Sequence, residues 1–592
     1  MLFEEMAKDF EKLESTSSRL AMVDILTDTL KNANKSEIES IVYMIQGMLA
    51  PPFKGIQIGM AEKFAEEAIA LTTGYTKEEI VASFRKTGDL GATAEQFVSK
   101  SKARPLSKKH LEINEVFATF YKIATISGQG SQDAKIKMLA ELLSRSTPIE
   151  ARYVVRFVMG TLRLGVGDAT ILEALSKLAT GERGFKEKLE NAYNMCSDLG
   201  RVANVLLEKG VKAIENFDVV LFNPIRPALA ERMPTPEEIL KKMGGVCAVE
   251  SKYDGLRAQI HMRKQDRKVE IFSRRLERIT PMFPEIAAAA LSEINAKEAI
   301  LDGEAISYNE VTDEFRPFQE TIQRKRKHGV EDMSKEMPLH VFAFDLLYYD
   351  GESYINKPYS ERRKKLEEIV ANKGTIRLAD KIETDSPKEF ERYFNDVIER
   401  GLEGIVAKDL KSKYVAGARK FSWIKMKRSY RGELTDTVDL TIVGYYLGKG
   451  VRAEFKFGGL LCAVYNDKRD MFETITKIGT GFSEAQMEEF RKMLEKITTK
   501  SKPARVDSKI SPDFWVEPKY VVTVKADEIT RSPMHTCGME TREGEVPTGY
   551  ALRFPRIIGS VRADKSPEDS TTTKEIIEMF NNQKKERIED AK

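Results

Sequence analysis

The hydrophobic pattern of this 592-residue chain changes abruptly near residues 222–227. Before that point apolar residues recur at helical spacing, as across residues 20–30 and 153–162. After it, short alternating or apolar runs that are typical of strands lie between helical stretches. The junction Phe222-Asn223-Pro224-Ile225-Arg226-Pro227 holds two prolines and an asparagine, which interrupt regular structure. The sequence therefore predicts a multidomain protein rather than one compact core.

Three regions follow from this pattern. Residues 1–221 are predicted to form an all-α domain. Residues 222–431 are predicted to be α+β, with strands over 246–250, 258–262, 269–273, 299–306, 340–347 and 404–407 and helices over 360–372 and 387–400. Residues 432–592 carry predicted strands at 440–446, 459–465, 473–478, 520–526 and 550–554, with helices at 483–497 and 573–585. Five short strands with glycine-rich turns are typical of a small all-β barrel of the oligonucleotide-binding (OB) type.

Capping residues mark helix starts in the first region. Thr76 is followed by two glutamates within three residues, and Thr147 precedes a proline at the first helical position, so both are predicted N-caps. The segment 164–168 (LGVGD) is predicted to end one helix and begin the next. Asp168 is expected to accept hydrogen bonds from the amides that follow it.

The composition excludes several classes of protein. The four cysteines, Cys196, Cys247, Cys462 and Cys537, are isolated singles, so neither a disulfide framework nor a cysteine zinc site is readable. Five histidines without metal-pair spacing argue against a transition-metal enzyme and favour a hard, oxygen-bound cation. No run approaches ~20 apolar residues and the start carries no secretion signal. We therefore expect no membrane association and a cytoplasmic location, nucleoid-associated if the source is prokaryotic.

Positive charge is gathered locally, although the net charge is only +3. Residues 411–431 hold eight Lys/Arg and no Asp/Glu, residues 97–110 hold five basic residues and no acid, and residues 324–327 form a third cluster. One such run is usually a solvated face. Three of them around the motifs below favour a polyanionic partner.

The sharpest motif is the segment 252–255 (KYDG), in which Lys252 ends a predicted strand and a turn leads into the next strand. Such a lysine can act as a nucleophile if cationic neighbours or burial favour its neutral form. Arg257 and the later basic run would supply that field. The alternative is an exposed lysine before an ordinary Asp-Gly hairpin, so the motif needs support from elsewhere in the chain.

Two carboxylates and one aromatic residue lie in predicted strands downstream. Glu304 sits in the apolar run 300–306 (ILDGEAI), and a buried carboxylate is costly unless it meets a hydroxyl, a cation or a metal. Glu403 repeats this pattern at the start of 403–408 (EGIVAK). Phe344 offers a ring on which a base could stack. Taken alone, Glu304 could instead lie on a solvated face and Phe344 in the core.

The segment 423–427 (WIKMK) alternates in polarity, which sends Lys425 and Lys427 to the same face of a strand. Two ammonium groups that point together repel each other unless an anion lies between them. A triphosphate would satisfy both.

Taken in order, these motifs resemble those of the covalent nucleotidyltransferases. KYDGLR at Lys252, SRR at Ser273, LDGEAI at Leu301, FAFDLLY at Phe342, EGIVAK at Glu403 and WIKMK at Trp423 are similar to the motif set of ATP-dependent DNA ligases of the archaeal and eukaryotic replicative type. The resemblance covers nearly the whole chain. It implies a helical DNA-binding domain with a signature at 163–175 (RLGVGDATILEAL), an adenylation domain, and a terminal OB-fold domain.

The resemblance also implies a role for each site residue. Lys252 would attack the α-phosphate of ATP, Glu250 would contact adenine through its backbone, and Phe344 would stack on the ring. Glu304 would bind the ribose, and Glu304 and Glu403 would lie near Mg²⁺, with Mn²⁺ as a substitute. The other binding residues would be Arg257 and Arg274 on the nucleotide or the nick 5′-phosphate, Arg419, Lys425 and Lys427 on phosphates, and Arg553 and Arg556 (RFPR) on the leaving pyrophosphate. The alternative for Arg553 and Arg556 is surface salt bridging.

The implied reaction seals nicks in duplex DNA during replication, repair and recombination, through a lysyl-AMP intermediate and a DNA-adenylate. The implied partners of a monomeric enzyme are nicked double-stranded DNA and a sliding clamp, although the sequence shows no clear clamp-binding peptide. RNA ligases and capping enzymes share Lys-x-Asp-Gly but generally lack so large a helical domain. A non-catalytic DNA-binding scaffold is the alternative from another class. NAD-dependent ligases are disfavoured, because the chain lacks their four-cysteine zinc site.

Overall fold

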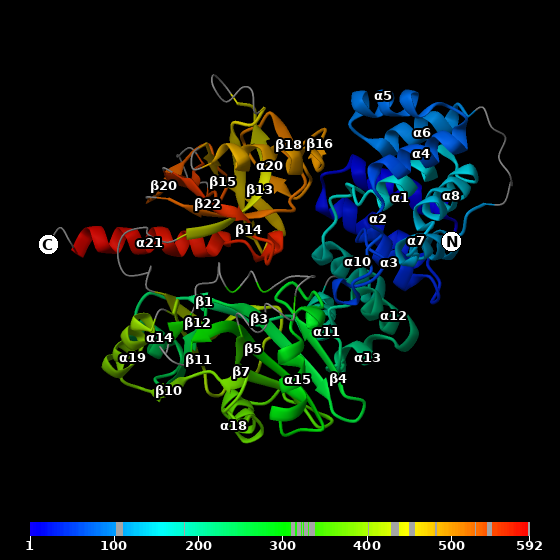
Figure 1. Cartoon of the computed structure of the whole chain (residues 1–592). Coiled ribbons are helices and arrows are strands. Elements are labelled where there is room, and N and C mark those ends of the chain that lie inside the picture. The colour runs from blue at the N-terminus through cyan, green and yellow to red at the C-terminus, as the bar shows by residue number, and fades with distance from the viewer. Residues whose placement is uncertain are drawn as a thin grey trace.

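The computed structural model shows three lobes that follow one another along the chain (Figure 1). It describes residues 1–101, 110–182, 184–309, 314–315, 321, 324, 330, 338–400, 402–427, 437–448, 456–479, 482–526, 528–540, 547–553 and 555–589. The basic clusters predicted at 97–110 and 324–327, and the end of the run 411–431, lie largely outside the described residues.

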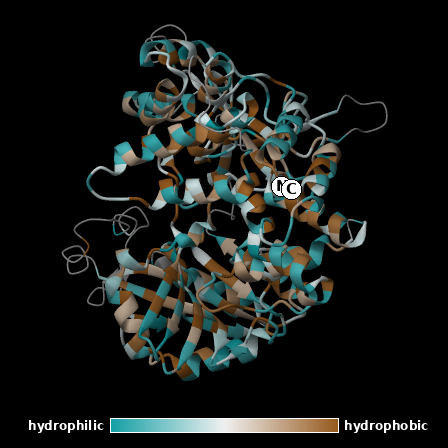
Figure 2. Ribbon diagram, turned by 90° about the vertical axis from the view of Figure 1, so that its right-hand side faces the viewer, coloured by the Kyte–Doolittle hydropathy of each residue, from teal (hydrophilic) through white to brown (hydrophobic). Residues whose placement is uncertain are grey.

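The first third of the chain is helical, as its apolar spacing predicts. Its helices are α1 (Phe3–Ser15), α2 (Arg19–Lys31), α3 (Ile38–Ile45), α4 (Glu62–Thr73), α5 (Lys77–Thr87), α6 (Leu90–Ser99), α7 (Ile113–Thr125), α8 (Ser131–Ser144), α9 (Pro148–Val158), α10 (Asp168–Thr180), α11 (Lys186–Cys196), α12 (Leu199–Lys209) and α13 (Val211–Glu215). They share one hydrophobic core, and hydrophobic and hydrophilic residues alternate along them (Figure 2). Thr76 and Thr147 cap α5 and α9 as predicted, each within a capping box.

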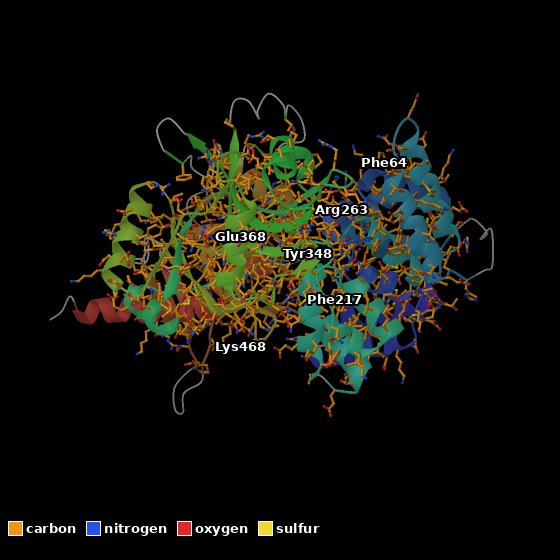
Figure 3. The ribbon with its side chains drawn as sticks, turned by 90° about the horizontal axis from the view of Figure 1, so that it is seen from below. Phe64, Phe217, Arg263, Tyr348, Glu368 and Lys468 are labelled. Carbon is orange, nitrogen blue, oxygen red and sulfur yellow. The ribbon has the colours of Figure 1, made fainter. Side chains whose placement is uncertain are left out.

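The prediction for Asp168 was wrong in its detail. Asp168 is the first residue of α10 and its side chain does not cap the helix. Its carboxylate instead accepts hydrogen bonds from Gln46 (2.7 Å), Tyr193 (2.6 Å) and Arg226 (3.0 Å). Because Arg226 belongs to the junction near residue 222, this network fastens the helical region to the next one. The two regions lie side by side, with Phe217 near their junction (Figures 1 and 3).

The middle region contains two sheets with separate hydrophobic cores. The five-stranded sheet has the order β1-β12-β11-β2-β10, and the seven-stranded sheet has the order β4-β3-β5-β7-β8 with β6 on β5 and β9 on β7. Their strands are β1 (Leu229–Arg232), β2 (Cys247–Lys252), β3 (Leu256–Arg263), β4 (Lys268–Phe272), β5 (Glu298–Asn309), β6 (Glu314–Phe315), β7 (Leu339–Tyr349), β8 (Glu352–Ser353), β9 (Ile376–Leu378), β10 (Lys381–Thr384), β11 (Gly404–Lys408) and β12 (Arg419–Lys427). The helices are α14 (Pro236–Lys242), α15 (Pro284–Glu293), α18 (Tyr359–Ile369) and α19 (Pro387–Glu399). The α+β prediction for this region is therefore confirmed.

The last region is a mixed sheet with two helices. Its sheet has the order β16-β18-β13-β14-β15-β17, with β19 between β13 and β22, and β20 and β21 pair separately. The elements are β13 (Thr437–Tyr446), β14 (Gly459–Asn466), β15 (Met471–Ile478), α20 (Glu484–Glu495), β16 (Thr498–Thr499), β17 (Val506–Asp507), β18 (Phe514–Val516), β19 (Val521–Lys525), β20 (Glu528–Ser532), β21 (Gly549–Arg553), β22 (Arg556–Val561) and α21 (Thr573–Glu589). Among the described residues, these pairings do not close the sheet into a barrel.

Helix α21 lies between the last region and the middle region (Figure 1). At its start, Lys574 binds Glu231 of β1 (3.0 Å) and Glu575 binds Lys425 of β12 (3.4 Å). The last region is thereby held against the five-stranded sheet. Within the described part of the chain, no helix combines the length and apolar character needed to span a membrane.

Candidate active site

Strand register arranges one face of the five-stranded sheet in rows. Three rows cross β2, β11 and β12: Lys252, Gly404 and Lys427; Glu250, Val406 and Lys425; Ala248, Lys408 and Trp423. Because side chains alternate along a strand, members of these rows share one face, and successive rows lie about 7 Å apart. The register therefore agrees with the prediction that Lys425 and Lys427 share a face, and it adds Lys252 and Glu250 to that face.

The first row carries a cluster of three charges. Glu403 binds the ammonium group of Lys252 with one carboxylate oxygen and that of Lys427 with the other. All three side chains are one-quarter exposed. Burial alone would raise the pKa of Glu403, but the two ammonium groups outweigh burial and hold that pKa well below its usual range. The charges of both lysines also act on Asp254, two residues after Lys252, so the cluster combines cations and carboxylates and is reached by solvent.

Glycines allow the backbone to approach closely around this cluster. Gly404 lies between Lys252 and Lys427, has φ +149°, and a Cβ there would collide with the carbonyl oxygen of Met426. A Cβ at Gly255, after the nucleophile candidate, would collide with the carbonyl oxygen of Ala305. These contacts explain why glycines accompany both charged motifs.

Glu304 and Arg257 face each other as Cα partners of β5 and β3. Glu304 is half-buried, and burial raises its pKa to about 7, although the charges of Lys252 and Arg257 oppose this shift. Arg257 is committed to the fully buried Asp302, with Nε donating to Oδ1 at 2.9 Å. Its guanidinium lies 5.1 Å from the ring centroid of Phe344. The structure thus gathers Lys252, Glu304, Arg257 and Phe344 in one neighbourhood, as predicted.

The carboxylate of Glu250 has a role that the sequence analysis missed. It is buried and binds Lys408 (2.7 Å), Arg363 (3.3 Å) and the hydroxyl of Tyr359. Lys408 also was not predicted. The available signal was its two-residue alternation with Gly404 and Val406, which becomes informative once the register with Glu250 is known.

The ring of Phe344 is half-buried and meets Trp423 edge to face, with centroids 5.8 Å apart. Trp423 is 4% exposed, and its indole N–H is buried without a hydrogen-bond partner among the described residues. A buried donor of this kind normally has an acceptor. This part of the site therefore has a partly exposed aromatic ring beside a buried donor that lacks an acceptor among the described residues.

Basic residues of the last region reach the same site, but not all are those predicted. Arg553 is exposed and donates to Thr530 (3.0 Å), and Arg556 is exposed on β22. Arg562 and Lys565 bind Asp439, and the charge of Arg562 acts on Asp254 beside Lys252. The missed signal is the charged run 562–565 (RADK), which follows RFPR.

Two further predicted residues behave differently. Arg274 pairs with Asp569 of the last region (3.8 Å), while its charge also acts on Glu304. Arg419 begins β12, but its side chain lies outside the described residues. Among the described side chains, no group of three or more His, Cys, Asp or Glu could hold a metal ion by itself.

Comparison with known proteins gives consistent matches along the chain. Residues 2–176 match the family described as DNA ligase N terminus, residues 227–427 the ATP dependent DNA ligase domain, and residues 453–565 the ATP dependent DNA ligase C terminal region. A probable DNA ligase of Dictyoglomus thermophilum is 49% identical over 590 residues, which cover 100% of this chain and 99% of the relative. A DNA ligase of Saccharolobus solfataricus is 44% identical over 599 residues, with coverage of 100% and 99%.

Solved structures are less similar. A mycobacterial DNA ligase D complexed with ATP and MES is 24% identical, with a TM-score of 0.34 and coverage of 58% of this chain and 97% of that chain. A structure titled Pmar-Lig_Pre is 19% identical, with a TM-score of 0.44 and coverage of 94% and 99%.

Proposed function

Because the chain belongs to the ATP-dependent DNA ligase family, we propose that it seals nicks in duplex DNA with Lys252 as its nucleophile. The observation that carries this assignment is the cluster in which Glu403 holds Lys252 and Lys427 side by side. Two lysine ammonium groups held side by side and partly open to solvent suit a triphosphate. The family-matched middle region, near 222–431, is the adenylation domain.

The reaction runs in three displacements at phosphorus. The ammonium group of Lys252 first gives up a proton, and its neutral Nζ then attacks the α-phosphorus of ATP. The bond to the bridging oxygen breaks, pyrophosphate leaves, and Nζ gives up a second proton to solvent. An oxygen of the 5′-phosphate at the nick then displaces the lysine and takes AMP. Finally the 3′-hydroxyl attacks that 5′-phosphate, AMP leaves, and the strand is sealed. The protein contributes mainly alignment and charge stabilisation.

The roles of the other residues follow from their places in the rows. Lys425 and Lys427 bind phosphate oxygens, with Arg419 beside them, and Phe344 stacks on adenine above the row of Glu250. Arg257 stays paired with Asp302 and forms part of the pocket wall. Arg274 binds the nucleotide once its ion pair with Asp569 has broken. Arg562, whose charge acts on Asp254, joins Arg553 and Arg556 in orienting pyrophosphate, while Lys565 stays paired with Asp439.

Mg²⁺ fits the acidic side chains of this site. Glu304 is a half-buried carboxylate whose pKa burial raises to about 7, so a cation beside it would relieve an unfavourable charge. Glu304 and Glu403 would hold the ion together with phosphate oxygens and water, which is the usual manner for Mg²⁺. Bound there, the ion supplies neutralisation of phosphate charge, and Mn²⁺ could replace it.

The helical region (1–221) would grip duplex DNA through phosphates and groove shape, because a nick can have any sequence. The last region (432–592) would act as the OB-fold domain, and the enzyme would work as a monomer. Affinity for nicked duplex should then fall steeply between about 50 and 200 mM salt. A flat salt dependence would contradict this part of the proposal.

The test is incubation with Mg²⁺ and ATP labelled at the α-phosphate, followed by denaturing electrophoresis. Wild type should become covalently labelled, and nicked DNA should chase the label into a sealed strand. Lys252→Ala should remain unlabelled. Lys252→Arg keeps the charge opposite Glu403 but cannot act as a nucleophile, so it should remain unlabelled while folding normally. A label that persists in Lys252→Arg would overturn the assignment, and sealing of RNA alone would indicate an RNA ligase.

A further inference from the structure

We infer that Lys408 is a positioning residue for the adenine of ATP, because its ammonium group ties the strand that carries Glu250 and Lys252 to the backbone of Phe344 on the facing sheet. This inference rests on the proposed function, since it concerns the same nucleotide site.

The geometry of Lys408 joins two sheets at one point. Its side chain is 1% exposed, and Nζ donates to a carboxylate oxygen of Glu250 (2.7 Å) and to the carbonyl oxygen of Phe344 (2.9 Å). Glu250 lies on β2 of the five-stranded sheet, whereas Phe344 lies on β7 of the seven-stranded sheet. One buried ammonium group therefore fixes the separation of the two sheets where the base is proposed to stack.

Aromatic rings hold the ammonium group from several sides. Nζ lies 4.2 Å from the ring centroid of Trp423, 4.8 Å from that of Phe344 and 4.9 Å from that of Tyr359. Cation–π attraction of this kind strengthens when the cation is desolvated. The position of Lys408 is thus set by two hydrogen bonds and three rings, which leaves little freedom to the Phe344 backbone.

The need to neutralise the charge of Glu250 does not by itself explain why a buried lysine stands at position 408. Arg363 and the hydroxyl of Tyr359 already bind the other carboxylate oxygen of Glu250. The hydrogen bond to the Phe344 carbonyl is separate from the pairing with Glu250, and it holds the backbone of the residue whose ring is proposed to stack on the base. Trp423, the Cα partner of Lys408, adds the buried indole N–H that has no acceptor among the described residues. Lys408 therefore contacts both the backbone and the ring neighbours of the proposed stacking residue.

Loss of the contacts of Lys408 should weaken the binding of adenine more than it slows the attack of Lys252 on ATP. In Lys408→Met, which keeps length but removes the charge, we expect the KM for ATP in enzyme adenylation to rise about 10-fold or more. kcat should fall less than KM rises. The preference for ATP over GTP should fall about 10-fold, because a loosened pocket discriminates less between bases.

The experiment measures adenylation of AMP-free enzyme by rapid quench for wild type, Lys408→Met, Glu250→Gln and the double variant. Lys364→Met, on the exposed side of α18, is the matched control. Lys408→Met leaves a buried carboxylate with one cation fewer, so it should unfold at a lower temperature. The double variant removes both charges and should recover stability. The double variant still lacks the hydrogen bond to the Phe344 carbonyl. The KM of the double variant for ATP and its preference for ATP over GTP should therefore stay altered.

Two outcomes overturn the inference: an unchanged KM in Lys408→Met, or a wild-type KM and ATP/GTP ratio in the double variant, which would mean that Lys408 only balances charge. If Lys408→Met does not fold, the KM for ATP and the ATP/GTP ratio of the double variant decide the question. If wild type itself forms no adenylate, the proposed function fails instead.

A binding readout that does not depend on turnover uses the two tryptophans of the chain, Trp423 and Trp515. In a Trp515→Phe, Lys252→Ala background, ATP should change the fluorescence of Trp423. Adding Lys408→Met should shift the midpoint of that titration by about 10-fold. A midpoint that does not move would contradict the inference.

Discussion

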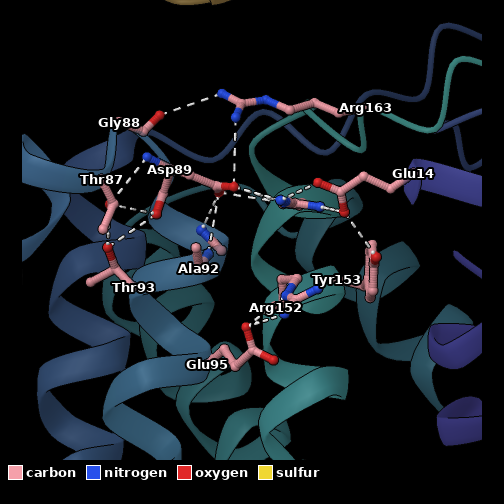
Figure 4. A network of polar contacts seen from close by, with 12 residues as sticks. Glu14, Thr87, Gly88, Asp89, Ala92, Thr93, Glu95, Arg152, Tyr153 and Arg163 are labelled. Carbon is pink, nitrogen blue, oxygen red and sulfur yellow. Dashed lines mark hydrogen bonds and ion pairs between the residues drawn. The ribbon is translucent and has the colours of Figure 1, made fainter. Parts of the chain in front are cut away.

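Two ionic networks in this molecule are built on opposite principles. In the helical region, Arg156 binds Asp89 and Glu14, each at 2.6 Å, and Arg163 lies 3.6 Å from Asp89 (Figure 4). Two guanidinium groups there face two carboxylates, and Asp89 also accepts from the amides of α6. In the middle region, the carboxylate of Glu403 binds both Lys252 and Lys427, and the charges of both lysines also act on Asp254.

The burial of the two networks differs as well. The side chains of Arg156 and Asp89 are 5% and 3% exposed, whereas those of Lys252, Glu403 and Lys427 are each 25% exposed. A balanced, buried network holds helices together, and removing one member leaves an unpaired buried charge. A cluster whose charged side chains are partly exposed instead leaves them accessible to a ligand. The comparison teaches that access to solvent, rather than the mere presence of ion pairs, distinguishes a site from a structural contact.

The largest effect should come from breaking the balanced network. Arg156→Met leaves Asp89 without its main partner, so we expect a loss of about 3–5 kcal/mol in stability. This corresponds to about 10 °C in the unfolding temperature of a region of ~200 residues. Calorimetry checks the prediction, with Lys177→Met, which breaks the exposed pair with Asp24, as the control that should cost less than about 1 kcal/mol. Similar losses in the two variants would remove the distinction drawn here.

Removing one cation from the partly exposed cluster should cost activity and not stability. In Lys427→Met the pair of Lys252 with Glu403 survives, so the unfolding temperature should stay within about 1 °C of wild type. Adenylation should slow about 10- to 100-fold, because one phosphate-binding charge is gone. Rapid-quench labelling with α-labelled ATP measures this, and Lys388→Met, exposed on α19, should adenylate normally. A stability loss as large as that of Arg156→Met would show that Lys427 is structural.

The smallest effect concerns pH. Burial raises the pKa of Glu304 to about 7 from an ordinary value near 4.5. A carboxyl group with a raised folded-state pKa stabilises the fold at low pH, and that contribution disappears as pH rises from about 4.5 through 7. Glu304→Gln stays neutral, so its unfolding temperature should gain a few degrees on wild type between pH 5 and pH 8. Scanning fluorimetry measures both unfolding temperatures across this pH range. If the difference between the variant and wild type stays constant, Glu304 is not desolvated.

Much of the fold could be predicted because local patterns decide it. The two-residue alternation of 423–427, the apolar run 340–347 and the capping of α5 and α9 depend on neighbours within a few positions. The predicted strand 246–250 differs from β2 by one residue at its start and two at its end. The prediction that Lys252, Glu304, Phe344 and Lys427 act in one site came from the resemblance of the ordered motifs to a known family, and not from local rules.

Long-range pairing could not be predicted, and the errors lie there. Asp168 reads as a cap from its neighbours, yet its partners Gln46 and Arg226 are far away in the sequence. Glu250 and Lys408 meet only because β2 and β11 are paired in one register. Arg562 and Lys565 reach the site through the packing of a whole domain, which no local pattern specifies.

The rows that cross β2, β11 and β12 also limit how such a protein can change over generations. Inserting or deleting one residue within any of these strands would turn its remaining side chains to the opposite face of the sheet and displace one column of every row beyond that point. A substitution changes this face at one position only, whereas a change of length alters every later position of the strand. The same limit holds for β3, β5 and β7, which carry Arg257, Glu304 and Phe344, so length can change only in the connections between strands.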